Sequence, residues 1–197
     1  MEIKYKTKSE SRIAYSNYIQ KHVDGVRKAF DLFGMELCKF VFEERNEMNK
    51  ISDPMDLYNK VSLIIPDHDK SKFGGCEFEA YAAKFYTSEE DDIDNIKTAF
   101  SKAWEHHKNI NKHHPEYWCV GEKDGKKIIV PMSPIYFIEM ILDWVSVSMV
   151  HESNVLDWWY NNDGGRKEKE KLLSKEDFKL VNKWLDINKA RLNFRKS

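Results

Sequence analysis

The chain of 197 residues has little glycine, proline or cysteine, and no excess of charge of either sign. Eight glycines and five prolines leave room for long regular elements and indicate mainly helices. The three cysteines, Cys38, Cys76 and Cys119, are odd in number and far apart, so a disulfide framework is not expected. Without a long apolar run or an apolar leader, the sequence predicts a cytoplasmic protein with no membrane segment.

The charge balance narrows the expected partners. The 32 Lys and Arg residues nearly cancel the 33 Asp and Glu residues, which leaves a net charge of −1 with neutral histidines. Nucleic-acid binding depends on clustered positive charge, so we do not expect a nucleic acid as partner. A hydrophobic fraction of 41% argues against disorder and, at this length, favours one globular domain.

Apolar periodicity predicts the elements. A helical face repeats in steps of three or four between Ile19 and Phe40, and further helices are expected before Pro66, before Pro115 and over 134–150. Asp124-Gly125 between β-prone runs predicts one hairpin within 117–130. We therefore expect an all-α helical bundle with one small β-hairpin, a single domain over 1–197 with its core at about 12–150 and a helical extension over 151–197.

Several histidines fall on stripes that otherwise face inward. His22 lies between Ile19 and Val26, and His68 is four residues beyond Ile64. His107 and His114 are seven apart, which places them on one face if the helix continues to Pro115. His106 and His113 fall off this stripe, so we expect them to face solvent or to lie outside the set of ligands. For any single histidine, an ordinary hydrogen-bonded side chain is the alternative.

Two carboxylates share a face of the helix expected over 134–150, since Glu139 and Asp143 are four residues apart. Imidazoles and carboxylates that converge from several helices form a site for one or two divalent metals. Burying such groups without a metal or a hydrogen-bond partner is costly. This ligand mixture suits Mn, Fe, Co, Ni, Zn or Mg, and the sequence does not choose among them.

The order of these residues carries a family resemblance: His22, His68-Asp69 with Lys72, His107, His114 and then Asp143. It resembles the HD-domain metal-dependent phosphohydrolases, helical domains in which a His, a His-Asp pair and a distant Asp surround a metal. Asp67-His68-Asp69-Lys70-Ser71-Lys72 is similar to their His-Asp-x-x-Lys string, although Ser71 stands where Gly is commonest.

The chain also resembles, more narrowly, a family of small uncharacterised bacterial and phage proteins, a domain of unknown function. That likeness rests on His68 to Phe73, Glu77, Tyr81, Trp104, His107, Asn111 and His113 to Glu116.

The HD resemblance implies roles for the candidate residues. His22, His68, Asp69 and Asp143 would hold the first metal, and His107 and His114 would complete a second site or bind the substrate phosphate. Asp69, Lys72 and Glu139 are the expected catalytic residues. Lys72 would reach a phosphate oxygen or pair with a carboxylate, and Glu139 would orient a histidine or accept a proton.

The sequence indicates less clearly which residues bind the substrate. Trp158 could stack on a base and Arg166 could contact a phosphate, although packing in the core is the alternative for the tryptophan. The predicted function is hydrolysis of a nucleotide or related phosphate ester, as a monophosphatase or a phosphodiesterase. The competing hypothesis is a non-catalytic HD-like module that binds a nucleotide or a protein.

Overall fold

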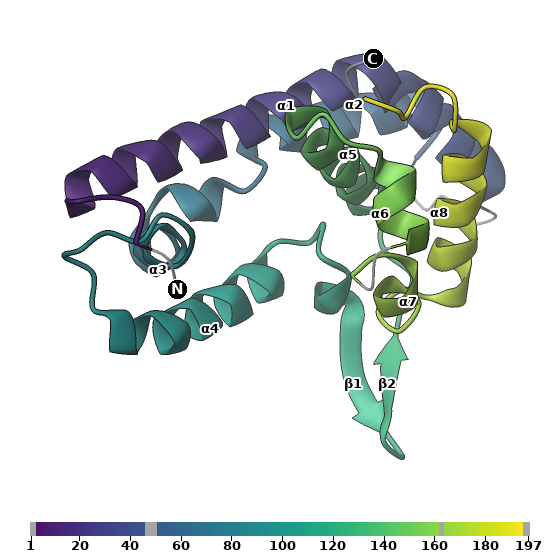
Figure 1. Ribbon diagram of the computed structural model, residues 1–197. Coiled ribbons are helices and arrows are strands. Elements are labelled where there is room, and N and C mark those ends of the chain that lie inside the picture. Colours follow the sequence, from purple (N-terminus) through teal and green to yellow (C-terminus); the bar gives the residue numbers. More distant parts are fainter. Residues whose placement is uncertain (1–2, 46–50, 162–163, 195–197) are drawn as a thin grey trace.

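The computed structural model describes residues 3–45, 51–161 and 164–194. It is an all-α fold with one small antiparallel hairpin, which confirms the predicted fold class (Figure 1). The α-helices are α1 (Lys8–Glu44), α2 (Pro54–Ile64), α3 (Gly75–Phe85), α4 (Ile93–Ile110), α5 (Pro134–Val150), α6 (Val155–Asn161), α7 (Arg166–Lys169) and α8 (Lys175–Ile187). Three short 3-10 helices are η1 (Ile65–Asp67), η2 (Lys70–Phe73) and η3 (Pro115–Trp118).

Helix α1 runs the length of the molecule and contributes to two hydrophobic cores (Figure 1). Its N-terminal half packs with α3 and α4 in the smaller core, which contains Ile19 and Val23. Its C-terminal half packs with α2, α5, α6 and α8 in the larger core, which begins on α1 at Val26. His22 therefore lies where the two cores meet on this helix. The extension over 151–197 contributes Trp159 and Trp184 to the larger core.

Helices α1 and α5 approach closely at Gly25. A Cβ atom at this position would lie 3.0 Å from Cγ2 of Val150 and 3.5 Å from Cβ of Ser146. Glycine thus allows a close crossing, in which a larger residue would require its neighbours on α5 to shift by a few tenths of an ångström. Because His22 is one turn from Gly25, this crossing brings it toward the face of α5 that carries Asp143.

The observed boundaries follow the sequence signals except at the end of α4. Helix α2 ends at Ile64, just before Pro66, and strands β1 (Cys119–Lys123) and β2 (Lys126–Ile129) flank Asp124 and Gly125, which have positive φ as a two-residue hairpin turn requires. Helix α4 was expected to reach His114 but ends at Ile110. Its end is formed by Asn111, whose side-chain Nδ2 and backbone N–H both donate to the carbonyl of His107.

Within the three described ranges, the hairpin is the only sheet, and all other β pairing consists of isolated bridges. The hairpin extends away from the helices (Figure 1). Over the same ranges, none of the helices combines the length and the apolar character that crossing a membrane requires.

Candidate metal centre

The His68-Asp69 pair lies in a sharp turn between two 3-10 helices. His68 has φ −53° and ψ 130°, and Asp69 has φ 54° and ψ 21°, in the left-handed region. In a continuous helix adjacent side chains diverge, whereas this turn buries both, each to 2% exposure. The left-handed conformation costs roughly 1–2 kcal/mol for most residues and less for Asp, so a strained turn is retained where it aims a carboxylate inward.

Four predicted ligands meet at this turn. Nε2 of His22 lies 3.3 Å from Oδ2 of Asp69 and 3.2 Å from Oδ1 of Asp143. Nε2 of His68 lies 3.7 Å from each of these two carboxylate oxygens and 3.3 Å from Nε2 of His22. The structure thus brings together one histidine from α1, the His-Asp pair and the aspartate from α5, so that four donor atoms face one another.

A second group of donors lies on the other side of Asp69. Donor atoms of Asp69, His107, His113 and His114 all lie within 4.8 Å of one another. Nε2 of His107 is 3.3 Å and Nε2 of His113 is 3.6 Å from Oδ1 of Asp69. Asp69 faces the first group with Oδ2 and the second with Oδ1, so its carboxylate is shared between them.

Three buried atoms of the second group have no hydrogen-bond partner among the residues that the structure describes: Oδ1 of Asp69, Nε2 of His107 and Nε2 of His114. Leaving a buried polar atom unpaired costs about 1–3 kcal/mol. Oδ1 of Asp69 has a lone pair suited to a cation, and each Nε2 has one in the tautomer that carries its proton on Nδ1. Donor atoms of the three residues lie within 4.8 Å of one another. Their chemistry therefore fits a divalent metal, and the buried His/Asp groups can bind one.

His113 does not face solvent, which was one of the two placements expected for it from the sequence. It is 3% exposed and belongs to two of the candidate ligand groups. The expectation assumed that α4 continues to Pro115, but the helix ends at Ile110 and the backbone N–H of His114 donates to the carbonyl of Asn111. This turn carries His113 inward beside His114. Asn111 ahead of a proline was the available signal, because both residues favour the end of a helix.

Two buried glutamates hold the Nδ1 side of the histidine rings. Oε1 of Glu139 lies 2.9 Å from Nδ1 of His68 and 3.4 Å from Nδ1 of His113. Oε2 of Glu77 lies 2.9 Å from Nδ1 of His107, while its Oε1 lies 2.6 Å from Nδ1 of the half-exposed His106. In a neutral ring, a carboxylate that accepts from Nδ1–H leaves the lone pair on Nε2, which is the atom directed into the centre.

Ser71, which follows Lys70 in the segment between Asp69 and Lys72, hydrogen-bonds to two polar side chains beside the second donor group. Its Oγ donates to Oε2 of Glu77 over 2.8 Å and accepts from Nδ2 of Asn111 over 3.0 Å. The hydroxyl therefore ties the loop after Asp69 to the glutamate that orients His107.

The charges of the centre compensate one another in the absence of metal. Burial lowers the pKa of His68, but Asp69, Asp143 and Glu139 outweigh it and raise that pKa to about 10. Burial raises the pKa of Asp69, yet Lys72 and His68 hold it well below its usual range. Nζ of Lys72 donates to Oδ2 of Asp69 over 2.6 Å. The carboxylates are therefore ionised, as metal ligation requires.

His114 behaves differently. Burial, together with the neighbouring His113 and His107, keeps its pKa well below the ordinary value. A histidine that resists protonation offers a neutral imidazole at neutral pH, which is the form that binds metals. This supports the sequence assignment of His114 to the ligand set.

Trp158 and Arg166 are not brought to this cluster in the described structure. The ring of Trp158 packs 5.2 Å from that of Trp144 and 5.9 Å from that of Trp159. The guanidinium of Arg166 lies over the rings of Tyr160 and Phe178. Both side chains thus contact residues of the C-terminal helices or of α5. For Trp158 this agrees with the alternative of packing against the core.

Comparison with known proteins gives one family. Residues 11–187 match a family of unknown function, DUF5662, and this range includes every candidate ligand named above. Searches of curated proteins and of solved structures found no match.

Proposed function

We propose that this chain, which belongs to the DUF5662 family of unknown function, is a metal-dependent phosphohydrolase acting on a nucleotide or related phosphate ester. The observation that carries the proposal is Asp69, a buried carboxylate shared by two groups of histidines, one oxygen of which has no hydrogen-bond partner among the residues that the structure describes. A relationship to the HD-domain phosphohydrolases is supported by the order of His22, the His68-Asp69 pair and Asp143 along the chain.

The donor set fits two divalent ions. His22, His68 and Asp69, with Asp143 beside both histidines, would hold one. Asp69, His107, His113 and His114 would hold the other. Mixed imidazole and carboxylate ligation suits Mn, Fe, Co, Ni or Zn, with Mg favoured less as imidazoles increase. Bound divalent metals supply an activated water at neutral pH and neutralise charge on phosphoryl oxygens.

The protein's own residues define how a substrate reaches the centre. The side chains of His68 and His107 are fully buried, whereas those of Asp143 and Lys72 keep 17% and 20% of their surface exposed. A substrate therefore approaches past Asp143 and Lys72. Lys72 carries a fixed positive charge beside Asp69, where it can bind a phosphoryl oxygen and stabilise charge that develops on it.

Glu139 and Glu77 serve as positioning residues. Each accepts from Nδ1 of histidines whose Nε2 atoms face the centre, so each fixes ring orientation and tautomer. Of the two roles predicted for Glu139, orientation of a histidine is the one that its contacts favour, because its oxygen is engaged with His68 and His113.

The test compares Asp69→Asn with Asp67→Asn. Asp67 is two residues away, exposed and paired with Lys70, so it is a matched control for the same loss of charge. We expect wild type and D67N, purified without chelator, to contain divalent metal and to release phosphate from nucleotides, and D69N to lose both. Hydrolysis that persists in D69N, or no metal after reconstitution with Mn, Co, Ni and Zn, would contradict the proposal.

A further inference from the structure

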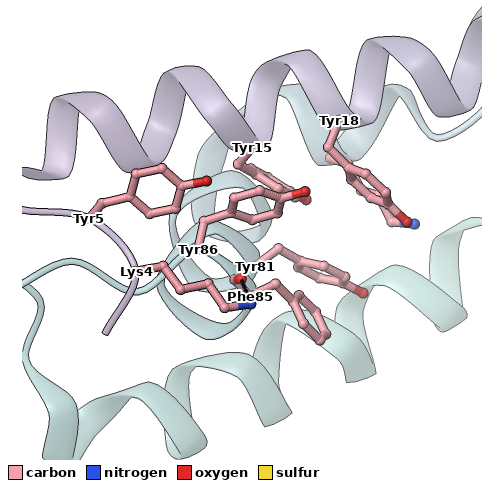
Figure 2. Close-up of a pocket in the computed structure, with 8 residues that line it drawn as sticks. Lys4, Tyr5, Tyr15, Tyr18, Tyr81, Phe85 and Tyr86 are labelled. Atoms are coloured by element: carbon pink, nitrogen blue, oxygen red, sulfur yellow. Dashed lines mark hydrogen bonds between the residues drawn. The ribbon is translucent and has the colours of Figure 1, made fainter. Parts of the chain in front are cut away.

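A pocket of about 420 Å³ opens beside the metal centre, between the N-terminal half of α1 and α3 (Figure 2). Five tyrosines, one phenylalanine and two lysines line it. Figure 2 shows Tyr15 and Tyr18 extending from α1 toward Tyr81 and Phe85 of α3. In the same view, Tyr86 lies between the side chains of α1 and those of α3. The volume falls in the range of pockets that bind small molecules.

Lys72 belongs to both the pocket and the metal centre. Its Nζ lies 2.6 Å from Oδ2 of Asp69 and 5.5 Å from the centroid of the Tyr81 ring. The Tyr81 ring is in turn 5.9 Å from the ring of His107. One end of the pocket therefore meets the shared carboxylate, and a ligand that fills the pocket reaches the centre at Lys72.

Two tyrosine hydroxyls of the pocket have no hydrogen-bond partner in the described chain. They are the hydroxyls of Tyr15, which is 1% exposed, and of Tyr81, which is 6% exposed. Burial raises the pKa of both phenols, so each keeps its proton and remains a donor. Buried donors are paired in nearly all proteins, which makes these two an independent indication of a polar ligand.

The rest of the pocket presents aromatic rings that are only partly covered. The ring of Tyr86 lies 5.7 Å from that of Tyr15 and 6.0 Å from those of Tyr18 and Tyr5. Phe85 is 46% exposed although its ring is apolar. Accessible aromatic faces next to a cation are the surroundings that suit a planar ring carrying an anionic group.

We propose that this pocket holds the nucleoside part of a nucleotide, with the phosphate at Lys72 and the base among Tyr18, Phe85 and Tyr86. The hydroxyls of Tyr15 and Tyr81 donate to oxygen or nitrogen acceptors of the sugar or base, which a plain hydrocarbon ring would not offer. This inference rests on the proposed function and deepens it. It assigns substrate selection to the tyrosines and not to Trp158 and Arg166.

Binding is tested separately from catalysis, with free adenosine, uridine and ribose titrated calorimetrically into the purified protein. We expect saturable binding of the nucleosides and none of ribose. Tyr18→Leu and Tyr86→Leu, which remove aromatic faces, should weaken binding about tenfold or more. Tyr15→Phe removes only an unpartnered hydroxyl, so it should weaken binding without lowering the unfolding temperature. The control is Tyr160→Phe on α6, whose hydroxyl donates to Asp186.

The catalytic arm compares adenosine 5′-monophosphate with ribose 5-phosphate in the metal-loaded protein. The ratio of their kcat/KM values should favour the nucleotide in wild type and fall about tenfold in Y18L and Y86L. Equal hydrolysis of both esters without nucleoside binding would overturn the pocket assignment and leave the phosphohydrolase standing. Nucleoside binding that Y18L and Y86L weaken, with no hydrolysis of either monoester or of nucleotide phosphodiesters, would support the pocket and overturn the proposed function.

Discussion

Oδ1 of Asp69 lies 3.3 Å from Nε2 of His107, and both atoms are buried without a hydrogen-bond partner in the described ranges. With Nε2 of His107 unprotonated, these two acceptor atoms leave their lone pairs unpaired, and a cation between them would bind both. The same carboxylate offers Oδ2 to His22 and to Lys72. Asp69 is thus the residue on which both donor groups depend.

Metal removal should destabilise the protein. A ligand present at 100 times its Kd contributes about 2.7 kcal/mol of stability, and about 1 kcal/mol shifts the unfolding temperature of a domain of this size by roughly 2–4 °C. We therefore expect treatment with a chelator to lower Tm by about 5–10 °C, and added Mn to restore it, as measured by calorimetry. An equal loss on chelator treatment in Asp69→Asn would place the stabilising metal elsewhere.

The stabilising effect of metal should grow with pH. The pKa of His68 in the metal-free fold is about 10, above its ordinary 6.5, so its ion pairs contribute fully below about pH 6.5 and are lost as pH rises toward 10. Metal instead competes with these protons and binds more tightly as they leave. Between pH 6.5 and 8.5 the Tm of the metal-free protein should fall while the gap to the metal-loaded protein widens. A gap that is constant or narrows over this interval would contradict the ligation by His68.

Replacing Glu139 by Gln should weaken metal binding without unfolding the protein. The amide retains the shape of the side chain but loses the negative charge of the carboxylate, whose Oε1 accepts from Nδ1 of His68 and His113. Substitutions of this kind cost about 10- to 100-fold in metal affinity. Glu105→Gln is the matched control, since Glu105 is exposed on α4 and pairs with Lys108. Titration with Mn measures both variants, and equal affinities would exclude an orienting role.

His113 provides a test of the second donor group. His113→Asn should reduce the metal content from two ions per chain toward one, because it removes a ligand beside His107 and His114 while the first group stays intact. His151→Asn, at an exposed position after α5, should leave the content unchanged. Elemental analysis of the two variants decides the matter, and equal content in both would show that His113 is not a ligand.

The sequence predicted a large part of the centre because its residues sit on regular stripes. The inward direction of His22 on α1 follows from its apolar neighbours Ile19 and Val26, and the four-residue spacing of Glu139 and Asp143 places them on one face of α5. The grouping of Asp143 with His22 came from the resemblance to the HD domains. The hairpin was predictable because Asp124-Gly125 is a local signal. These features depend on nearby residues, which a single sequence displays.

Features that depend on distant packing were not predictable in the same way. The inward turn of Asp69 is a single left-handed residue, and the burial of His113 depends on where α4 stops. Both break the helical period on which the prediction relied. The tyrosines of the pocket meet only because α1 and α3 pack side by side, so nothing local distinguishes Tyr15 or Tyr81 from ordinary core aromatics.

The most direct test is the position of the metal in a crystal grown with Mn. Anomalous scattering should give one peak within about 2.0–2.3 Å of donor atoms of His22, His68 and Asp143, a second beside His107, His113 and His114, and Asp69 between them. Crystals that take up no Mn at Asp69, or that hold it only at surface carboxylates, would contradict the account.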